Sequence, residues 1–417
     1  MKIAIFGMAR SGQSVFKFLS KKPTDEVFVI NQGDPTSWEC YELVKGHLDH
    51  CYNQSEALDL LAQMDLIVLS PGIPRFVEEL KLALESGVSV ISEIEFAYRY
   101  SDIPVIGITG TNGKTTTTTM IKEALESFGK RVFACGNIGV PYTEILLSDE
   151  SYDYVVVELS SFQLESIDTF HPFISIIINI TKSHMERYDS IEDYKNAKLN
   201  ILKNQNSSDY AICGLEVQTD AEVIEIKPLT NFDFTKSKII GEHNKYNFFC
   251  AYEVCRLLNL PGLDTTFQSF IDDFKGVSLR LEYIGEYQGL SIYNDGKSTN
   301  DAATVAAVNS FYSSEDLYLI LGGQLRSGDI TLQNSLGGKN IKKILAFGEA
   351  RDVIKKELKE YDVICFESLE HIFDYVCSNN LKGILLFSPA FPSFDQFKNY
   401  EIRGARYTQL SRDLLLR

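Results

Sequence analysis

A glycine-rich segment in the second quarter of the chain carries the strongest chemical signal. It lies between a hydrophobic and a threonine-rich stretch and consists of Gly110, Thr111, Asn112, Gly113, Lys114, Thr115 and Thr116. Small residues let backbone N–H groups curl around phosphate oxygens, the lysine offers a charge to the outer phosphates, and the next hydroxyl can ligate Mg²⁺. The general phosphate-loop pattern has a glycine where Ile108 stands, so only the shorter G-x-x-G-K-T form is present. A plain glycine turn is the alternative, and the flanking strand and helix patterns favour the phosphate loop.

Two polar side chains follow later hydrophobic stretches, at positions where α/β proteins form ligand sites. Glu158 ends one stretch and could hold Mg²⁺, although alone it would be an ordinary carboxylate at a strand end. His184 comes just after the next stretch and could be a metal ligand, a phosphate donor or a loop histidine. Lys198 follows on an expected amphipathic helix, where its position alone predicts an exposed, solvated side chain.

Polar segments recur in the second half of the chain. Residues 241–247 open an expected helix, so this segment could cap the helix or bind a nucleotide. Residues 294–300 follow an expected strand and combine a carboxylate, a lysine and helix-capping residues, and residues 321–323 and 388–390 end two further strands. We expect these three strand ends to share one sheet edge and to face a cleft with the middle of the chain, although each could be a plain turn.

The elements that would position these residues alternate between strand and helix. Expected strands lie at 3–6, 27–30, 65–69, 88–91, 105–109, 155–158, 174–180, 280–282, 291–293, 317–321, 344–347 and 384–387. Expected helices lie at 116–127, 191–203 and 247–258, with an earlier one ending at residue 19. Strands separated by helices predict mostly parallel sheets with crossover helices. We therefore expect an α/β protein of three domains, 1–102, 103–276 and 277–417, of which the first and last are Rossmann-like and the central one is P-loop ATPase-like.

Length and composition limit the class of protein. A chain of 417 residues is too long for one core and suits two or three domains. The net charge of −17 argues against broad binding to nucleic acid or anionic membranes. Eight cysteines without C-x-x-C or zinc spacing predict buried thiols in a reducing compartment. The apolar runs are too short for a signal peptide or a membrane helix, so we expect a soluble, cytoplasmic protein.

Together these segments resemble the Mur ligase family along nearly the whole chain. The most discriminating are 158–164, His184-Met185-x-Arg187-Tyr188 and 395–404, and the last points to the members that add D-glutamate. The resemblance implies a cytoplasmic, ATP-dependent ligase of peptidoglycan precursor synthesis that joins D-glutamate to UDP-N-acetylmuramoyl-L-alanine through an acyl phosphate. The three domains would bind the UDP substrate, ATP and the amino acid, in that order. The protein is expected to be a monomer whose partners are these small molecules, with no nucleic acid and no membrane insertion.

The resemblance also implies roles for individual residues. Lys114, His184 and Lys198 would be catalytic. Thr115 and Glu158 would hold a first Mg²⁺ ion, and His184 a second, together with Lys198 carbamylated by CO₂. Nucleotide contacts would come from residues 110–116 and from Asn244, Asn247, Arg280 and Asp295. Substrate contacts would come from Arg10, Ser11, Gly72, Asn137, Ser161, Gln163, Lys297, Thr299, Arg326, Ser393 and Tyr400.

The chain departs from the family pattern at several of these positions. Asn31, Gln32 and Gly33 stand where an acidic residue and an arginine usually lie near the uracil. Arg326 stands where a lysine usually meets the glutamate carboxylate, which keeps the charge but changes the geometry. Tyr400 replaces a phenylalanine. These changes bear on the uracil contacts and on the specificity for the amino acid.

Three other functions compete with this one. Another Mur ligase, or an amide ligase like folylpolyglutamate synthetase, would share the nucleotide site and differ in the amino acid it takes. A binding protein that uses ATP only to change shape would need no segment like 388–404. A dinucleotide-binding oxidoreductase would use Gly7 and Gly12, but that glycine pattern is incomplete, and Asn31 takes the usual position of the acidic residue that binds ribose.

Overall fold

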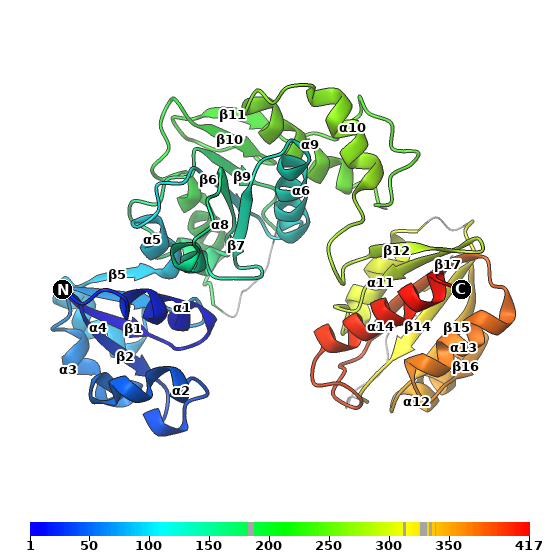
Figure 1. The fold of residues 1–417 in the computed structure, drawn as a ribbon, viewed down its shortest axis with the longest axis horizontal. Coiled ribbons are helices and arrows are strands. Elements are labelled where there is room, and N and C mark those ends of the chain that lie inside the picture. Colours follow the sequence, from blue (N-terminus) through cyan, green and yellow to red (C-terminus); the bar gives the residue numbers. More distant parts are fainter. Residues whose placement is uncertain (182–186, 240, 312–313, 326–331, 333–335, 338) are drawn as a thin grey trace. The chain divides into compact units, whose positions relative to one another are not determined.

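Three open sheets follow one another along the chain in the computed structural model, which describes all residues except 182–186, 240, 312–313, 326–331, 333–335 and 338 (Figure 1). Contacts within the chain divide it into two units. The first unit comprises 1–229 with 246–267 and holds the first two sheets, and the second comprises 230–245 with 268–417 and holds the third. None of the described helices combines the length and the apolar character that crossing a membrane requires. The domain boundaries at residues 102 and 276 stay predictions.

The first sheet is five-stranded and parallel, with the strand order β3-β2-β1-β4-β5. Its strands are β1 (Lys2–Phe6), β2 (Glu26–Asn31), β3 (Cys51–Asn53), β4 (Leu66–Leu69) and β5 (Ser89–Ser92). The helices between them are α1 (Arg10–Leu19), α2 (Tyr41–Val44), α3 (Leu58–Leu61) and α4 (Glu78–Glu85). A Cβ atom on Gly12 would lie 1.9 Å from the carbonyl oxygen of Gly7. Only glycine therefore lets α1 begin so close to the end of β1.

The second sheet is six-stranded and parallel, with the order β11-β10-β9-β6-β8-β7. Its strands are β6 (Val105–Thr109), β7 (Val132–Gly136), β8 (Tyr154–Glu158), β9 (Ile174–Ile177), β10 (Tyr210–Cys213) and β11 (Glu222–Glu225). Its helices are α6 (Lys114–Ser127), α7 (Ser161–Leu164), α8 (Ile191–Leu199), α9 (Asn244–Leu257) and α10 (Leu263–Asp273). The central strands β6 and β9 are buried along their whole length, as expected for parallel strands covered on both faces.

The third sheet has six strands in the order β12-β13-β17-β14-β15-β16, and only the β12–β13 pair is antiparallel. Its strands are β12 (Glu282–Tyr287), β13 (Leu290–Asn294), β14 (Leu317–Gly322), β15 (Ile341–Phe347), β16 (Val363–Cys365) and β17 (Gly383–Ala390). The helices are α11 (Asp301–Asn309), α12 (Arg351–Glu357), α13 (Leu369–Asn379) and α14 (Tyr400–Leu415). Apolar residues of α11 and α12 form one core with the sheet, and those of α13 and α14 form another. The sheet is thus covered on both faces.

Several expected elements differ from those observed. The strand expected at 280–282 is wrong, because Leu279 and Leu281 have φ angles of 60° and 48° and form a turn before β12. The strand expected at 174–180 ends at Ile177, and the one expected at 384–387 continues to Ala390. The helix expected at 191–203 ends at Leu199 and is followed by a short 3₁₀ turn. Strands β3, β7, β10, β11 and β16 were not expected.

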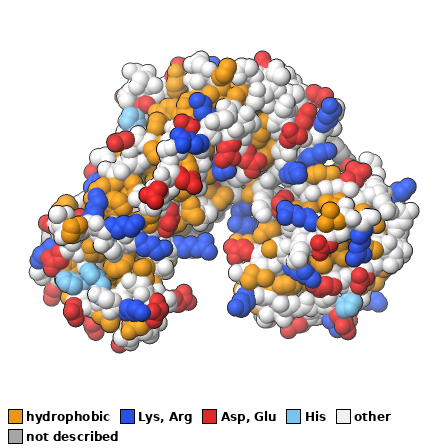
Figure 2. Space-filling view, in the orientation of Figure 1, with side chains coloured by type: hydrophobic (Ala, Val, Ile, Leu, Met, Phe, Trp, Pro, Cys, Tyr) orange, Lys and Arg blue, Asp and Glu red, His pale blue; other side chains and the backbone are white. Residues whose placement is uncertain are grey.

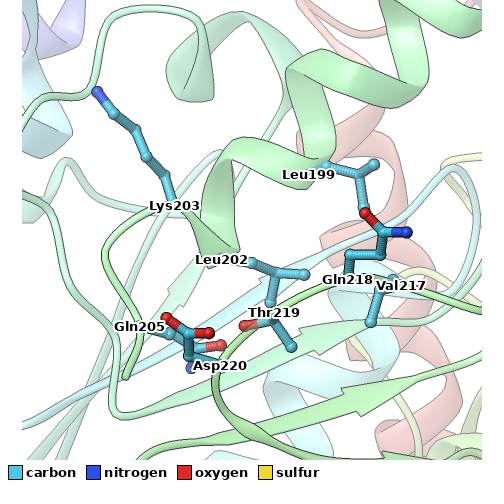
Figure 3. Close-up of a pocket in the computed structure, with 8 residues that line it drawn as sticks. All are labelled: Leu199, Leu202, Lys203, Gln205, Val217, Gln218, Thr219 and Asp220. Carbon is cyan, nitrogen blue, oxygen red and sulfur yellow. The ribbon is translucent and has the colours of Figure 1, made fainter. Parts of the chain in front are cut away.

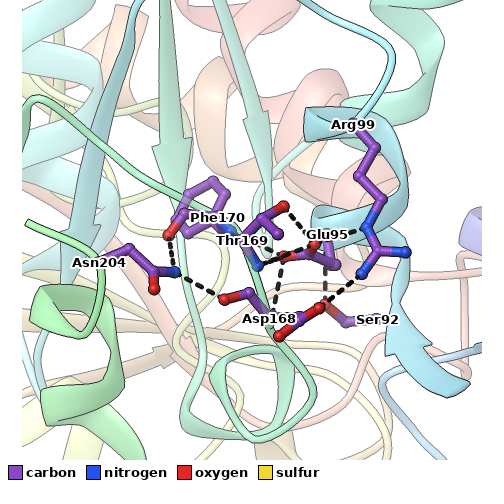
Figure 4. A network of polar contacts seen from close by, with 7 residues as sticks. All are labelled: Ser92, Glu95, Arg99, Asp168, Thr169, Phe170 and Asn204. Atoms are coloured by element: carbon purple, nitrogen blue, oxygen red, sulfur yellow. Dashed lines mark hydrogen bonds and ion pairs between the residues drawn. The ribbon is translucent and has the colours of Figure 1, made fainter.

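A short helix, α5 (Glu93–Tyr98), connects the first two sheets and is fixed by buried carboxylates (Figure 4). The Glu95 side chain is fully buried and accepts hydrogen bonds from the backbone N–H groups of Asp168, Thr169 and Phe170 at 2.8–3.0 Å. Arg99, the C-cap of the same helix, donates to Glu95 at 2.7 Å. Since a buried carboxylate needs hydrogen-bond donors, Glu95 ties the first sheet to the loop before β9.

Candidate functional site

The phosphate loop predicted from the sequence joins β6 to α6. Gly113 has a φ of 86°, which favours glycine, and α6 begins at Lys114. A Cβ atom on Gly110 would lie 3.2 Å from the Cβ of Ile178. The two glycines thus let the loop run close to the end of β9 and turn into a helix of 14 residues. The first N–H groups of such a helix have no partner within it and carry a partial positive charge, which suits an anion.

The lysine of this loop folds over the loop itself. Lys114 Nζ donates to the carbonyl oxygens of Gly110 and Thr111 at 2.9 and 3.0 Å. The ammonium charge therefore lies within the curve of the loop, beside the N-terminus of α6. This is the place where the outer phosphates of a nucleotide need a counter-charge.

A hydroxyl and a carboxylate meet beside the lysine. Thr115 Oγ1 donates to Glu158 Oε2 at 2.9 Å, and Asn137 Nδ2 donates to Glu158 Oε1 at 2.8 Å. Glu158 ends β8 and is only 2% exposed. Oxygen ligands of these kinds are the ones that Mg²⁺ takes in proteins, usually with substrate phosphates and water completing the shell. The Thr115–Glu158 pair therefore fits a magnesium ion in chemistry.

The structure brings Lys198 to the same loop. Its side chain is 1% exposed, and Nζ donates to the carbonyl oxygen of Gly110 at 2.9 Å and lies 4.8 Å from the centre of the Tyr194 ring. Burial, and then the charge of Lys114, lower the pKa of Lys198 to about 7, against the opposing effect of Glu158. The prediction from its position alone, an exposed and solvated side chain, is therefore wrong. Only the family resemblance had placed this residue in the site.

The segment after β8 is ordered by its own side chains. Ser160 caps α7, and its Oγ accepts from the N–H of Gln163 at 3.2 Å, while Gln163 Oε1 accepts from the N–H of Ser160 at 2.9 Å. Ser161 and Gln163 are both buried. This reciprocal capping box fixes the segment directly after Glu158. Contacts from Ser161 and Gln163 to a substrate stay predictions.

The residues predicted in the first sheet lie near its glycine turn. Arg10 and Ser11 begin α1, where Arg10 is exposed, and Gly72 is exposed in the loop after β4. Asn31, which stands at the usual acidic position, accepts a hydrogen bond from the N–H of Met8 at 3.2 Å through Oδ1. Asn31 thus supports the backbone of the glycine turn. A role of these residues in binding the UDP substrate stays a prediction.

In the third sheet, Asp295 lies in a buried network directly after β13. Its Oδ2 accepts from Ser388 Oγ at 2.8 Å, and its Oδ1 accepts from the N–H of Leu281 at 3.3 Å. Burial raises the pKa of Asp295 to about 6, although its hydrogen bonds to Ser298 and Ser388 oppose this. Arg280 is exposed in the turn that the Leu281 hydrogen bond holds. Asp295 and Arg280, two of the predicted nucleotide-binding residues, are therefore linked through the peptide group between Arg280 and Leu281.

The predicted amino-acid residues gather around the ends of β13 and β17. Lys297 Nζ lies 5.8 Å from the centre of the Tyr400 ring, and Thr299 is half-buried in the same segment as Lys297. Ser393 is 1% exposed, and its Oγ has no hydrogen-bond partner among the described residues. One residue without a predicted role, Arg403 on α14, is fully buried here and donates through Nη1 to the carbonyl oxygens of Gly322 and Pro392 at 3.2 and 3.1 Å. Its place inside the segment 395–404 was the only signal that the sequence offered.

Two of the predicted site residues lie in the first turn of helix α9, and two others are not among the residues that the structure describes. Asn244 begins α9, and Asn247 Oδ1 accepts from Thr117 Oγ1 of α6 at 3.2 Å. His184 and Arg326 lie outside the described residues. Within the first unit, the structure therefore gathers around the phosphate loop these predicted residues: Lys114, Thr115, Asn137, Glu158, Lys198 and Asn247.

Two further features bear on where ligands bind. The hollow in Figure 3 has a volume of about 570 Å³ and lies between Leu199, Leu202 and the segment 217–220, and none of the predicted site residues lines it. On the face shown in Figure 2, acidic and basic side chains are interspersed. The groups around the phosphate loop thus remain the best-built candidate site.

Comparisons with known proteins show the family of the chain. The family model "Mur ligase middle domain" matches residues 108–235, and the model "Mur ligase MurD-like, N-terminal domain" matches residues 1–92. A protein of Aquifex aeolicus named UDP-N-acetylmuramoylalanine–D-glutamate ligase is 32% identical over 430 residues, which cover 98% of each chain. The protein belongs to the Mur ligase family.

Two other comparisons extend this result. A protein of Geotalea uraniireducens with the same name is 33% identical over 449 residues, covering 99% of this chain and 97% of its own. The crystal structure of MurF from Acinetobacter baumannii superposes with a TM-score of 0.58 at 14% identity, over 97% of this chain and 93% of that one. At such low identity the match shows the fold alone, and the three-domain α/β Mur ligase fold expected from the sequence is confirmed.

Proposed function

We propose that this Mur ligase joins D-glutamate to UDP-N-acetylmuramoyl-L-alanine with the energy of ATP. The observation that carries the proposal is the name shared by relatives that are 32% and 33% identical and match almost the whole chain. In the proposed reaction, the γ-phosphoryl group of ATP forms a bond to a carboxylate oxygen of the L-alanine residue, and ADP leaves. The amine of D-glutamate then attacks the acyl carbon, phosphate leaves with the bonding electrons, and the amine loses a proton.

The first step brings two anions together, and the loop supplies the opposing charge. Lys114 and the N–H groups at the start of α6 would bind the β- and γ-phosphates. Asn247 contacts α6 through Thr117, which supports its proposed place beside the nucleotide. Fixed donors of this kind stabilise charge without reorganising during the reaction, so they act most strongly in the transition state.

Thr115 and Glu158 would hold a magnesium ion. Their oxygens lie 2.9 Å apart at the mouth of the loop, and Asn137 fixes the second carboxylate oxygen of Glu158. When bound, Mg²⁺ neutralises phosphate charge and aligns the transferring group. Thr115 and Glu158 would in this way position the phosphate chain. The Glu158 side chain is buried at the end of β8, and its two hydrogen bonds fix its orientation.

Lys198 would carry a carbamate. Its pKa near 7 leaves much of the amine neutral at neutral pH, and a neutral amine can add to CO₂ and release a proton. The product is a carboxylate on a long side chain, next to Gly110 and Tyr194. Such a group, with the imidazole proposed at His184, would supply oxygen and nitrogen ligands for the second magnesium ion.

The amino acid would bind at the third sheet. Ser393 offers a buried hydroxyl that no described side chain uses, and Lys297 offers a cation beside the Tyr400 ring. D-Glutamate carries two carboxylates that need such partners. Arg326 would provide a second cation. A site that hydrogen-bonds one amino acid can reject a close analogue by about 10⁴.

A phosphate-release assay tests this function. The complete chain is incubated with ATP, Mg²⁺ and UDP-N-acetylmuramoyl-L-alanine, and D-glutamate is compared with L-glutamate, L-lysine and diaminopimelate. We expect phosphate release with D-glutamate only. Release with a different amino acid would instead favour another Mur ligase activity, and release with a folate and L-glutamate a folylpolyglutamate synthetase-like one. ATP that is bound but not hydrolysed under any mixture would favour a nucleotide-driven binding protein.

A further inference from the structure

The segment after β9 contacts the phosphate loop through an asparagine that no predicted role includes. We propose that Asn179 is a positioning residue, which fixes the backbone of Thr111 and Asn112 so that the start of α6 is aimed at the nucleotide phosphates. The proposal rests on the nucleotide site argued above and adds a residue to it. Asn179 lies two residues beyond the end of β9 and is half-buried.

The asparagine binds both polar groups of one loop residue. Asn179 Oδ1 accepts from the N–H of Asn112 at 3.0 Å, and Nδ2 donates to the carbonyl oxygen of Asn112 at 3.1 Å. The backbone carbonyl of Asn179 accepts from the N–H of Thr111 at 2.8 Å. Asn179 thus makes three hydrogen bonds to two consecutive loop residues and fixes their backbone.

A second residue completes the contact. The N–H of Thr181 donates to Thr111 Oγ1 at 2.9 Å, and Thr111 Oγ1 lies 3.2 Å from the carbonyl oxygen of Thr181, to which it can donate. We call Asn179 and Thr181 the loop clamp. The clamp binds Thr111 and Asn112, whereas Lys114 Nζ donates to the carbonyl oxygens of Gly110 and Thr111. The clamp and the lysine therefore both hold the loop.

The clamp engages the N–H groups of two loop residues. Those of Thr111 and Asn112 both donate to Asn179. The loop then continues through its N-cap, Gly113, into α6, which begins at Lys114. Because Gly113 with its φ of 86° turns the chain directly after the clamp, the orientation of the clamped peptide sets the direction in which α6 begins.

Asn179 acts through the loop and not on the nucleotide. Both ends of its side-chain amide bind the backbone of Asn112, so the amide is already committed to the protein. A loss of this residue should therefore reduce nucleotide affinity without changing the groups that touch phosphate. The binding of the UDP substrate should change little, because its predicted contacts include neither the clamp nor the loop backbone.

The test compares two leucine substitutions in the complete chain. Asn179→Leu removes both side-chain bonds at similar volume. The matched control is Asn204→Leu, because the Asn204 side chain also makes two hydrogen bonds to the backbone. Its Nδ2 donates to the carbonyl oxygens of Asp168 and Phe170 at 2.8 and 2.9 Å (Figure 4). Calorimetry measures the Kd for Mg-ADP and for UDP-N-acetylmuramoyl-L-alanine, and thermal unfolding shows that each variant is folded.

We expect Asn179→Leu to weaken Mg-ADP binding about tenfold, as the loss of two hydrogen bonds that organise a site would do, and to leave the Kd for the UDP substrate within about twofold. Asn204→Leu should leave both within about twofold. Unchanged Mg-ADP binding in Asn179→Leu, or an equal loss in Asn204→Leu or for both ligands, would overturn the proposal.

A second variant keeps the test decisive if Asn179→Leu does not fold. Asn179→Asp retains an acceptor for the N–H of Asn112, loses the donor, and brings a negative charge beside the phosphates. We expect a loss of Mg-ADP affinity greater than tenfold at low salt that shrinks as salt is added. Wild-type affinity in Asn179→Asp would also overturn the clamp. Wild-type protein that fails to bind Mg-ADP would refute the nucleotide site itself, and with it the proposed function.

Discussion

At the scale of residues, two lysines share one carbonyl oxygen. Lys114 Nζ and Lys198 Nζ both donate to the oxygen of Gly110 at 2.9 Å. Burial opposes the charge on Lys198, and the nearby charge of Lys114 repels it further, so the pKa of Lys198 falls to about 7. Lys198 can thus supply a neutral amine directly beside the loop lysine. The carbonyl oxygen of Gly110 therefore contacts both the proposed phosphate-binding lysine and the proposed carbamate-forming lysine.

The first prediction concerns the charge on the loop. Lys114→Ala should lower the rate of phosphate release by at least about a hundredfold, because it removes a fixed charge from the developing phosphate charge. The control is Lys122→Ala on the same helix, where the lysine is partly exposed and pairs with Glu126. That control should retain near-normal turnover. Normal turnover in Lys114→Ala would contradict the proposed phosphate role.

The second prediction follows from the sign of the Lys198 shift. Its pKa is about 7 in the folded state and 10.5 ordinarily, so between these values the unfolded chain binds more protons. Stability should therefore rise with pH across this window, by up to about 1.4 kcal/mol per pH unit from this group, and the penalty is complete below about pH 7. Urea unfolding in CO₂-free buffer at pH 7 and pH 9 measures the slope. Lys198→Met should reduce the slope, and an identical slope in that variant would refute the shift.

At the scale of elements, the sequence predicts the strands that form continuous hydrophobic runs. The central strands β6 and β9 are buried on both faces, so their apolar runs were visible in the sequence. The edge strand β11 is largely exposed and β16 has three residues, so neither leaves a clear pattern. The turn around Arg280 was missed because leucine rarely adopts the positive φ angles found at Leu279 and Leu281.

The same reasoning separates the parts of the candidate site. The phosphate loop and Glu158 could be predicted, because a glycine pattern and a polar strand end are local signals. The burial of Lys198 and the contacts of Asn179 depend on how α8 and β9 pack beside the loop. No local pattern reports such packing. The sequence therefore predicted where the candidate phosphate loop lies, and not which residues hold that loop in place.

The third prediction concerns the cap of α7. Ser160→Ala removes the acceptor for the N–H of Gln163 and should lower the free energy of unfolding by about 1 kcal/mol. Urea unfolding measures this change. Ser148→Ala, in the exposed loop after the 3₁₀ turn at Tyr142–Leu147, is the control and should change stability by less than about 0.5 kcal/mol. Equal effects of the two substitutions would argue against the capping box.

At the scale of the whole molecule, the first two sheets form one unit and the third belongs to another. Buried carboxyl groups on α5 contribute to the first union. Glu95 receives three backbone N–H groups from the loop before β9, and Glu93 accepts from the N–H and hydroxyl of Thr143, near β7. Loss of the Glu95 carboxylate would leave three N–H groups without this partner, and such a loss costs more than the net worth of the hydrogen bonds themselves.

The fourth prediction tests this union. Glu95→Ala should lower the free energy of unfolding by at least about 3 kcal/mol, since three N–H groups lose a buried partner. Glu126→Ala, which removes one member of an exposed pair with Lys122, should change it by less than about 1 kcal/mol. Urea unfolding followed by far-UV circular dichroism measures both. A small effect of Glu95→Ala would mean that apolar packing alone joins the two sheets.

The positions of the accessible thiols and of the single tryptophan allow a distance measurement between the two units. Six of the eight cysteines are buried, and the two that are partly accessible, Cys365 and Cys377, both belong to the second unit. The single tryptophan of the chain, Trp38, lies in the first unit. A dye that reacts with accessible thiols would therefore label one unit while the native fluorophore marks the other. Resonance energy transfer between them would follow ligand-driven changes in separation without engineering any residue.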